Sequence, residues 1–377
     1  MRPALNGKTE RRIDNYVFVT NMENRRIRVA ITHGDTNGIG YEIILKAFDD
    51  PTMLELCTPI IYGNPKVAEQ HRNAMKLDTQ YGIINKTEDA RDGHLNLLAT
   101  FDDDVKVELG SPTQESADAA KRALQRAKED LKKGLYDVLV QAPVVGSNVP
   151  DREDRSLMVM FADDIRIALI TNHLPIKEVA SSISQETIIG KATLFHTSLK
   201  RDFRINNPRI AVLALNPQPG AEEEEIIRPA VVALSDKGIQ AYGPYTADEF
   251  FGENMQNSFD GIMAMYDDQG IAPFKTLAHE YGVKMKTGFP FVITTPSHGP
   301  AFDIAGKGIA DPASLRHAIY AAIDIFRNRI EYDRPMKNPL PKLYHEKKED
   351  SDRARFPRKP FAQKQEAQQT DEETTEG

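Results

Sequence analysis

The segment at residues 293–312, ITTPSHGPAFDIAGKGIADP, places the tightest limit on how this chain can fold. It begins as a short β-branched run, passes through a loop rich in Gly, Pro and Ser, and leads into residues 313–329, whose apolar side chains recur at helical spacing. Asp311 is expected to be the N-cap of that helix, with Pro312 in its first turn. The order of strand, loop and helix predicts an α/β unit whose loop ends at a helix N-terminus, where free N–H groups favour an anion.

The glycines of this loop allow two interpretations. Gly299, Gly306 and Gly308 would let the backbone come close to a bound ligand. They could equally do no more than shape the connection between the strand and the helix. Their spacing alone leaves both interpretations open.

The rest of the chain repeats this order of strand and helix. Strands are expected at residues 26–32, 59–63, 136–143, 165–171, 209–215, 259–266 and 289–295, and another begins at Ser156. Helices are expected at residues 41–48, 176–183, 186–199 and 221–237, and a long one is expected to run from an N-cap at Ser111 to a stop at Gly134. Residues 68–104 are too irregular for an assignment. The alternation predicts an α/β fold in which functional loops follow the carboxyl ends of parallel strands.

Composition narrows the class of protein. The 377 residues are 40% hydrophobic and 28% charged, which suits a globular protein with two domains, and the net charge of -8 argues against a nucleic-acid surface. No membrane span is visible. The single cysteine, Cys57, and an N-terminus without an apolar signal core favour the cytoplasm. Residues 1–25 form a polar extension with one apolar patch at 16–19 that could be an edge strand, and residues 331–377 are expected to be a disordered polar tail.

Five motifs carry a resemblance to a known family. They are GDTNGIG at 34–40, TNHLP at 171–175, LNPQPG at 215–220, AMYDDQG at 264–270 and the opening segment at 293–312. Together they resemble the isocitrate/isopropylmalate dehydrogenase superfamily, and most closely its vitamin B6 branch, the 4-hydroxythreonine-4-phosphate dehydrogenase family. The resemblance runs from about residue 26 to about residue 329. It implies an enzyme that uses NAD and a divalent metal to oxidise a phosphorylated hydroxy-amino acid, which then decarboxylates.

The resemblance also implies an architecture. It predicts a two-domain isopropylmalate-dehydrogenase-like fold with the active cleft between the domains. The cofactor-side domain would comprise residues 26–140 with 297–330, and residues 141–296 would form the domain for substrate, metal and dimerisation. A homodimer is expected because sites of this family take residues from both subunits.

The family's three metal histidines fall on His173, Gln218 and Asp267 of this chain. A neutral amide oxygen is a poor ligand, whereas a carboxylate suits hard cations, so the resemblance implies Mg²⁺ or Mn²⁺ rather than Zn²⁺ at His173 and Asp267. Asp268, next to Asp267, is a candidate for acid–base catalysis. The two aspartates could equally be loop carboxylates that cap the following turn.

The family's substrate positions are only partly kept. Its lysine persists as Lys275, a candidate for both catalysis and substrate binding, while its asparagine falls on Lys284 and its arginine on Ile293. Lys284 would restore positive charge for a small anionic substrate, without the two-pronged geometry of an arginine. The family's Gly-His-Thr-Glu motif is missing, because the chain passes from Pro143 through residues 144–151 directly to a charged segment.

The cofactor positions look more complete. The resemblance implies that NAD binds at His298, Gly299, Asp303, Gly306 and Gly308. The acidic run at residues 222–225 is expected to be a solvated first helical turn, favoured by the helix dipole, rather than a metal site. The leading expectation is therefore a divergent oxidoreductase of this family. Two alternatives remain, namely a dehydrogenase of another hydroxy acid that uses Mg²⁺ or Mn²⁺, and a nucleotide-binding paralogue without catalysis.

Overall fold

The computed structural model describes residues 25–101, 104–144, 156–278 and 281–337. Contacts divide the chain into two units, residues 1–335 and residues 336–377. The edge strand expected at 16–19 and the expected tail beyond residue 337 lie outside the described residues.

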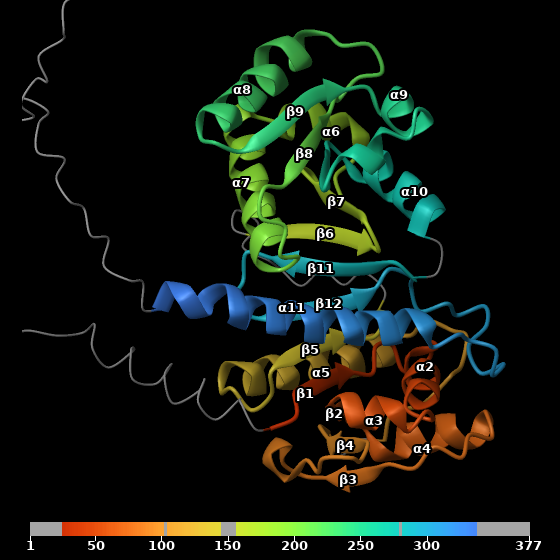
Figure 1. Cartoon of the computed structure of the whole chain (residues 1–377). Coiled ribbons are helices and arrows are strands. Elements are labelled where there is room, and N and C mark those ends of the chain that lie inside the picture. Colours follow the sequence, from red (N-terminus) through yellow and green to blue (C-terminus); the bar gives the residue numbers. More distant parts are fainter. Residues whose placement is uncertain (1–24, 102–103, 145–155, 279–280, 338–377) are drawn as a thin grey trace, which may run out of the picture. The chain divides into compact units, whose positions relative to one another are not determined.

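A twelve-stranded sheet runs through the first unit (Figure 1). Its strands lie in the order β3 (Gly82–Ile84), β4 (Asn96–Ala99), β2 (Thr58–Gly63), β1 (Arg28–Thr32), β5 (Val138–Gln141), β12 (Val292–Pro296), β11 (Val283–Thr287), β6 (Leu157–Ala162), β7 (Ile165–Leu169), β10 (Gly261–Ala264), β8 (Arg209–Leu213) and β9 (Gln240–Tyr245). Neighbouring strands are parallel except for the three pairs β12–β11, β11–β6 and β6–β7. The carboxyl ends of β1, β5 and β12 therefore lie at the opposite edge of the sheet from those of β7, β8 and β10.

Helices connect most of the strands. They are α2 (Gly40–Ala47), α3 (Thr52–Leu56), α4 (Pro65–Ala74), α5 (Gln114–Lys132), α6 (Ile176–Ser182), α7 (Gln185–Arg201), the π-helical turn η3 (Glu223–Ile227), α8 (Arg228–Asp236), α9 (Ala247–Gly252), α10 (Asp267–Ala278) and α11 (Ala313–Lys337). The mixed α/β class is confirmed, and so is the order of strand, loop and helix at residues 293–312, which β12 and α11 enclose.

Three details differ from the sequence-based expectation. Helix α5 begins after Thr113 rather than Ser111, because Thr113 and Ser116 form a reciprocal capping box. Helix α11 continues to Lys337, past the expected end at residue 329. Several elements had no assignment. Strand β11 was missed because its lysines alternate with apolar residues, and most of α4, β3 and β4 lies in the irregular stretch at residues 68–104. The elements α3, β9 and α9 were also not expected.

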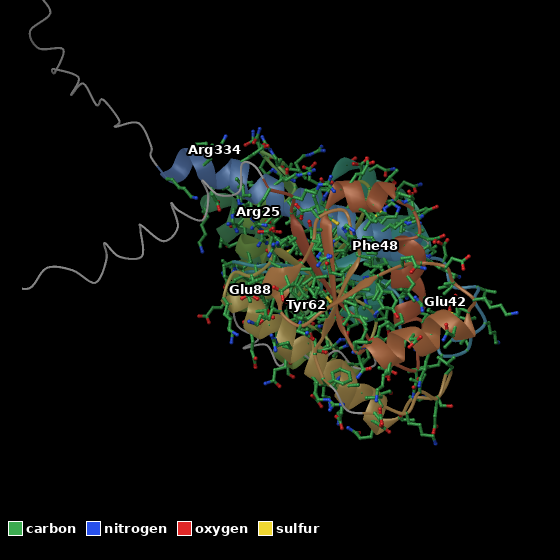
Figure 2. All side chains as sticks on the ribbon, turned by 90° about the horizontal axis from the view of Figure 1, so that it is seen from below. Arg25, Glu42, Phe48, Tyr62, Glu88 and Arg334 are labelled. Atoms are coloured by element: carbon green, nitrogen blue, oxygen red, sulfur yellow. The ribbon has the colours of Figure 1, made fainter. Side chains whose placement is uncertain are left out.

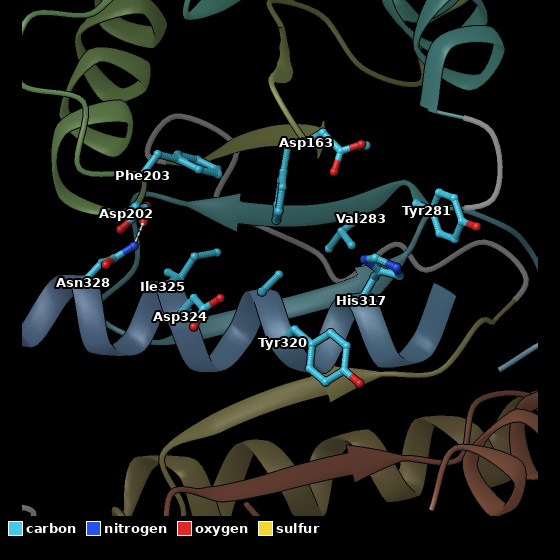
Figure 3. Close-up of a pocket in the computed structure, with 13 residues that line it drawn as sticks. Asp163, Asp202, Phe203, Tyr281, Val283, His317, Tyr320, Asp324, Ile325 and Asn328 are labelled. Atoms are coloured by element: carbon cyan, nitrogen blue, oxygen red, sulfur yellow. Dashed lines mark hydrogen bonds between the residues drawn. The ribbon is translucent and has the colours of Figure 1, made fainter. Parts of the chain in front are cut away.

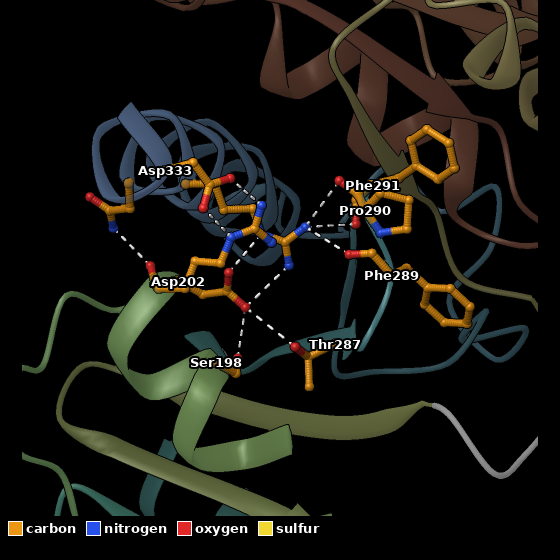
Figure 4. A network of polar contacts seen from close by, with 10 residues as sticks. Ser198, Asp202, Thr287, Phe289, Pro290, Phe291 and Asp333 are labelled. Carbon is orange, nitrogen blue, oxygen red and sulfur yellow. Dashed lines mark hydrogen bonds and ion pairs between the residues drawn. The ribbon is translucent and has the colours of Figure 1, made fainter. Parts of the chain in front are cut away.

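A buried ion pair fixes α11 against the rest of the fold (Figure 4). The Arg329 and Asp202 side chains are only 6% and 1% exposed, and Arg329 Nε lies 2.6 Å from Asp202 Oδ1. Ser198 donates a hydrogen bond to the same carboxylate, and Arg329 Nη1 donates to the carbonyl oxygens of Phe289 and Phe291. Because each buried charge is paired and hydrogen-bonded, the end of α7, the turn before β12 and α11 are held in one arrangement.

Candidate functional site

The structure brings the two expected metal ligands together. His173 follows β7, and Asp267 begins α10 directly after β10. Since β7 and β10 are adjacent and parallel, their carboxyl ends meet at one edge of the sheet. Asp267 Oδ2 accepts the backbone N–H of His173 at 2.5 Å and lies 3.8 Å from His173 Nδ1.

The other oxygen of Asp267 is available to a ligand. Asp267 Oδ1 is buried and accepts no hydrogen bond from any described residue. Such an atom is the kind that a bound cation satisfies. The described residues contain no group of three His, Cys, Asp or Glu side chains placed to hold a metal. Asp267 and His173 therefore fit a hard cation that completes its coordination with water and substrate oxygens, as Mg²⁺ commonly does.

Gln218, the remaining family metal position, is exposed on a loop that Glu223 holds in place. Glu223 Oε1 accepts the backbone N–H groups of Leu215 and Asn216, each at 2.9 Å, and Oε2 accepts that of Gly220 at 2.6 Å. Burial alone would raise the pKa of Glu223, but these donors outweigh it and the pKa is lowered.

The expectation of a solvated acidic turn was therefore wrong for Glu223, which is fully buried. It holds for the next two residues, since Glu224 and Glu225 are exposed and Glu224 pairs with Arg228 one turn further on. No signal in the sequence separates Glu223 from its acidic neighbours, because its partners lie in the preceding loop.

A second unrecognised residue, Gln269, joins the ends of two strands. Its side chain accepts the N–H of Met265 and donates to the carbonyl oxygen of Ala214, both at 2.6 Å. Gln269 thereby fixes the end of β10 relative to the end of β8, the two strands that lead to Asp267 and Gln218. It is a positioning residue for the same edge of the sheet.

Lys284 lies close enough to Asp267 for the two charges to interact. It lies on β11, directly opposite Met160 of β6, on the face of the sheet that α10 covers. Burial lowers the pKa of Lys284, Lys275 lowers that pKa further, and Asp267 raises it. The Lys284 amine makes no hydrogen bond or ion pair with a described residue.

Lys275 and Asp268 are both exposed on α10. Asp268 lies in the first turn of this helix, and no contact within the described part of the chain links it to another site residue. Asp267 and Asp268 are therefore helical rather than loop residues. The carboxylate of Asp267 accepts a hydrogen bond from His173, not from its own helix.

Hydrogen bonds hold the expected cofactor loop at both of its ends. Helix α11 begins at Ala313, so Pro312 rather than Asp311 holds the capping position; Asp311 Oδ1 accepts the N–H of Ala313 at 2.8 Å from one residue earlier, and His298 Nε2 lies 2.6 Å from Ser314 Oγ. A Cβ added at Gly299 or Gly308 would meet no heavy atom within 4 Å. Asp303 is exposed between them.

Glu42 and Lys46 of α2 form an ion pair that fixes the far end of this loop. Figure 2 labels Glu42. Glu42 Oε1 accepts the N–H of Ala310 at 2.8 Å. Lys46 Nζ, 2.8 Å from the same carboxylate oxygen, donates to the carbonyl oxygens of Gly308 and Ala310. The sequence shows Glu42 and Lys46 one helical turn apart, but their partners lie more than 260 residues away and could not be inferred.

The GDTNGIG loop at residues 34–40 is buried, and its polar groups form hydrogen bonds with other segments of the protein. Its backbone donates from Asp35 to the carbonyl oxygen of Pro143 and from Ile39 to that of Pro300. Asn37 Nδ2 donates to the Ser111 carbonyl oxygen and to the Thr113 hydroxyl. The loop therefore joins the segment after β5 to the cofactor loop.

Two other expectations concern the missing substrate motif and membrane-spanning helices. The missing substrate motif falls at residues 144–151, of which 145–151 lie outside the described residues. In the described part of the chain, no helix combines the length and apolar character needed to cross a membrane.

Comparison with known proteins covers most of the chain. Residues 55–322 match the family model described as pyridoxal phosphate biosynthetic protein PdxA. A 4-hydroxythreonine-4-phosphate dehydrogenase of Bacteroides thetaiotaomicron is 48% identical over 358 residues, covering 89% of this chain and 98% of that protein. Another from Sulfurihydrogenibium sp. is 35% identical and covers 80% of this chain and 99% of its own length.

A solved structure agrees with these sequence matches. The crystal structure of 4-hydroxythreonine-4-phosphate dehydrogenase from Klebsiella pneumoniae superposes with a TM-score of 0.67 at 26% identity and covers 80% of this chain and 100% of that one. The match to the family model, the coverage of both relatives and this likeness agree with the motifs at the ends of β7, β8, β10 and β12. The chain belongs to the PdxA family of pyridoxal phosphate biosynthetic proteins.

Proposed function

We propose that this protein is an NAD-dependent oxidoreductase that acts on a small phosphorylated hydroxy acid, with 4-phosphohydroxythreonine as the first candidate. The observation that carries the proposal is the position of Asp267, whose buried oxygen has no hydrogen-bond partner among the described residues, beside His173 and within electrostatic range of Lys284, which Lys275 also reaches. A carboxylate and an imidazole suit a hard cation, and two lysines suit an anionic substrate. The alignments with two relatives named 4-hydroxythreonine-4-phosphate dehydrogenase cover 98% and 99% of those relatives.

Each side chain has a proposed role. His173 and Asp267 hold Mg²⁺ or Mn²⁺, which when bound polarises the substrate oxygen. Lys284 and Lys275 bind the anionic groups of the substrate, and Lys275 with Asp268 exchanges its protons. NAD lies on the loop of His298, Gly299, Asp303, Gly306 and Gly308, where open space beside Gly299 and Gly308 precedes the N-terminus of α11.

The proposal extends to the assembly and the compartment. We propose a cytoplasmic homodimer, with residues 26–140 and 297–330 on the cofactor side and residues 141–296 on the side of substrate, metal and dimer contact. Size measurement in solution tests the dimer, and a mass near 42.2 kDa would contradict it.

Turnover of 4-phosphohydroxythreonine is expected to be at least about a thousandfold below that of a complete family member. Loss of one well-placed charged donor typically removes two to three powers of ten. Here Gln218 replaces a metal ligand, Ile293 replaces an arginine, and the Gly-His-Thr-Glu motif has no counterpart. The assay is NADH formation with Mg²⁺, Mn²⁺ or Zn²⁺ added, and turnover at the usual family level would refute the expectation.

A binding experiment separates a weak enzyme from a paralogue without catalysis. Mn²⁺ binding, measured by electron paramagnetic resonance, is expected to be lost in Asp267→Asn and kept in the neighbouring control Asp268→Asn. Calorimetric binding of NAD without turnover of any phosphorylated hydroxy acid would favour the nucleotide-binding alternative. Stoichiometric Zn²⁺ in the purified protein, or Mn²⁺ binding unaffected by Asp267→Asn, would overturn the metal assignment.

A further inference from the structure

A cavity of about 250 Å³ lies beside α11, between this helix and the ends of β6 and β11 (Figure 3). Val283 of β11 lines it, whereas the next residue, Lys284, belongs to the candidate site. Successive residues of a strand point to opposite faces of a sheet. The cavity is therefore separate from the site of His173, Asp267 and Lys284, and no role proposed above uses it.

Aromatic rings gather at one end of the cavity. The rings of Tyr281 and His317 lie 4.8 Å apart between centroids, and those of His317 and Tyr320 lie 6.1 Å apart. Figure 3 shows these three side chains together, with Asp202 and Asn328 at the other end. Tyr281 is 49% exposed and Tyr320 is 39% exposed, so both retain ring surface that a ligand can cover.

The charges that line the cavity are all negative. Its lining contains three carboxylates and no lysine or arginine. Asp202 is neutralised by Arg329, but Asp324 has only a distant partner, with Arg327 at 3.9 Å between two exposed side chains. The carboxylate of Asp163 forms no ion pair with a described residue. A positive group in the cavity would thus meet uncompensated negative charge.

One of the lining rings, Phe203, already makes a cation–π contact within the protein. The guanidinium of Arg166 lies over Phe203 at 5.0 Å from the ring centroid, and its N–H groups donate to the backbone carbonyl oxygens of Asp163 and Asp164. Arg166 thereby leaves the Asp163 carboxylate free. In Figure 3, Asp163 and Asp324 approach the cavity from opposite sides, one from the turn between β6 and β7 and the other from α11.

We propose that this cavity binds a small organic cation, namely an alkylated ammonium group with a short apolar body. The ammonium would lie against the faces of Tyr281 and Tyr320, with Asp163 and Asp324 as counter-charges. Its apolar part would rest on Phe161, which also lines the cavity. The volume is below the roughly 300–1,000 Å³ of drug-sized pockets, which limits the ligand to a few carbon atoms around the charge.

The test compares two probes that differ only in charge. Choline and its neutral isostere 3,3-dimethyl-1-butanol are titrated into the full-length protein by calorimetry. Choline is expected to bind in the millimolar range and at least about fivefold more tightly than the isostere. Equal affinity for the two probes, or no choline binding in the tens of millimolar range, would overturn the proposal.

Variants assign the binding to this cavity. Tyr281→Leu and Asp163→Asn are each expected to weaken choline binding by about threefold to tenfold. Asp163 has a φ of +46°, which asparagine also adopts readily, so its replacement keeps the turn. Asp164→Asn is the matched control, because Asp164 lies in the same turn and does not line the cavity. Unchanged binding in both variants, or an equal loss in the control, would contradict the assignment.

Discussion

The chain contains two glycine-rich loops that look alike in sequence and differ in what surrounds their glycines. In the loop at residues 34–40, a Cβ added at Gly40 would overlap the carbonyl oxygen of His33, and one at Gly38 would lie 2.8 Å from that of Pro300. In the loop at residues 298–311, a Cβ at Gly299 or Gly308 would meet nothing, whereas one at Gly306 would lie 2.7 Å from Leu109 Cδ1. The first loop needs glycine because the protein packs against its backbone, and the second leaves its backbone open at Gly299 and Gly308.

This difference shows which structural conclusions a glycine motif supports. Glycine marks a place where something comes close to the backbone, but the motif does not distinguish a protein carbonyl from a cofactor phosphate. Exposure makes the distinction, and exposure depends on elements that are remote in sequence. Substitutions in the two loops and in the residues that support them test this difference.

Gly40→Ala should destabilise the protein by several kcal/mol or prevent folding, since the new methyl group has no space beside the His33 carbonyl. Gly299→Ala is the control and should change the free energy of unfolding by less than about 0.5 kcal/mol. Urea unfolding followed by circular dichroism measures both. Similar values for the two variants would remove the distinction between the loops.

The packed loop should also make stability depend on pH. Burial lowers the pKa of His33 to about 3, and its ring, stacked on Tyr41, has no hydrogen-bond partner among the described residues. Between the unfolded pKa near 6.5 and the folded pKa, the unfolded chain binds the extra proton, so stability falls as pH falls, by up to about 1.4 kcal/mol per pH unit.

Unfolding midpoints at pH 7 and pH 5 test this expectation, with His33→Phe as the variant. Phenylalanine keeps the stacked ring and cannot be protonated, so this part of the pH dependence should disappear. His71, which is also buried with a lowered pKa, should leave a smaller remainder. An equally steep pH dependence in His33→Phe would assign the effect to other groups.

In the loop at residues 298–311, we expect substitution of a residue that holds the loop to have a larger effect than substitution of Gly299 or Gly308. Lys46→Met removes two hydrogen bonds to the loop and leaves the buried carboxylate of Glu42 without its ion pair, which should cost about 1–3 kcal/mol of stability. If the loop holds NAD, the dissociation constant for NAD should rise by about tenfold. Lys121→Met, on an exposed pair of α5, is the control for both measurements.

The smallest effect is expected at Gly308. Its φ of +69° lies in the left-handed region, so Gly308→Ala should cost about 1 kcal/mol through backbone strain alone, as no atom opposes the methyl group. Thermal unfolding measures the loss. A much larger loss would mean that this part of the loop is packed like the loop at residues 34–40.

Much of the fold could be inferred from the sequence because local patterns decide it. Runs of buried apolar residues predicted β1, β2 and β5, and the Asp-Pro pair predicted the start of α11. Thr113 was missed as a cap because Ser111 and Thr113 both have the side chain required, and only the capping box with Ser116 separates them. In β11, lysines on one face hid a strand whose other face is buried.

The candidate site was predictable to a lesser extent. The resemblance placed His173 and Asp267 at strand ends, and in the structure the backbone N–H of His173 donates to the Asp267 carboxylate while the imidazole Nδ1 lies 3.8 Å from it. Glu223, Glu42 and Lys46 could not be found, because each supports a loop through partners that only the folded chain supplies. Sequence patterns indicate residue chemistry better than they indicate which residues hold a loop in position.

The reversal of strand direction in the middle of the sheet has a mechanical consequence. β12, β11, β6 and β7 are joined to one another by continuous antiparallel ladders, with no loop interrupting the hydrogen bonds across them. We therefore expect this part of the molecule to resist hinge bending, because a bend between these strands would break ladder hydrogen bonds. Displacement of the edge that holds Asp267 relative to the first strands would have to change the twist of these four strands.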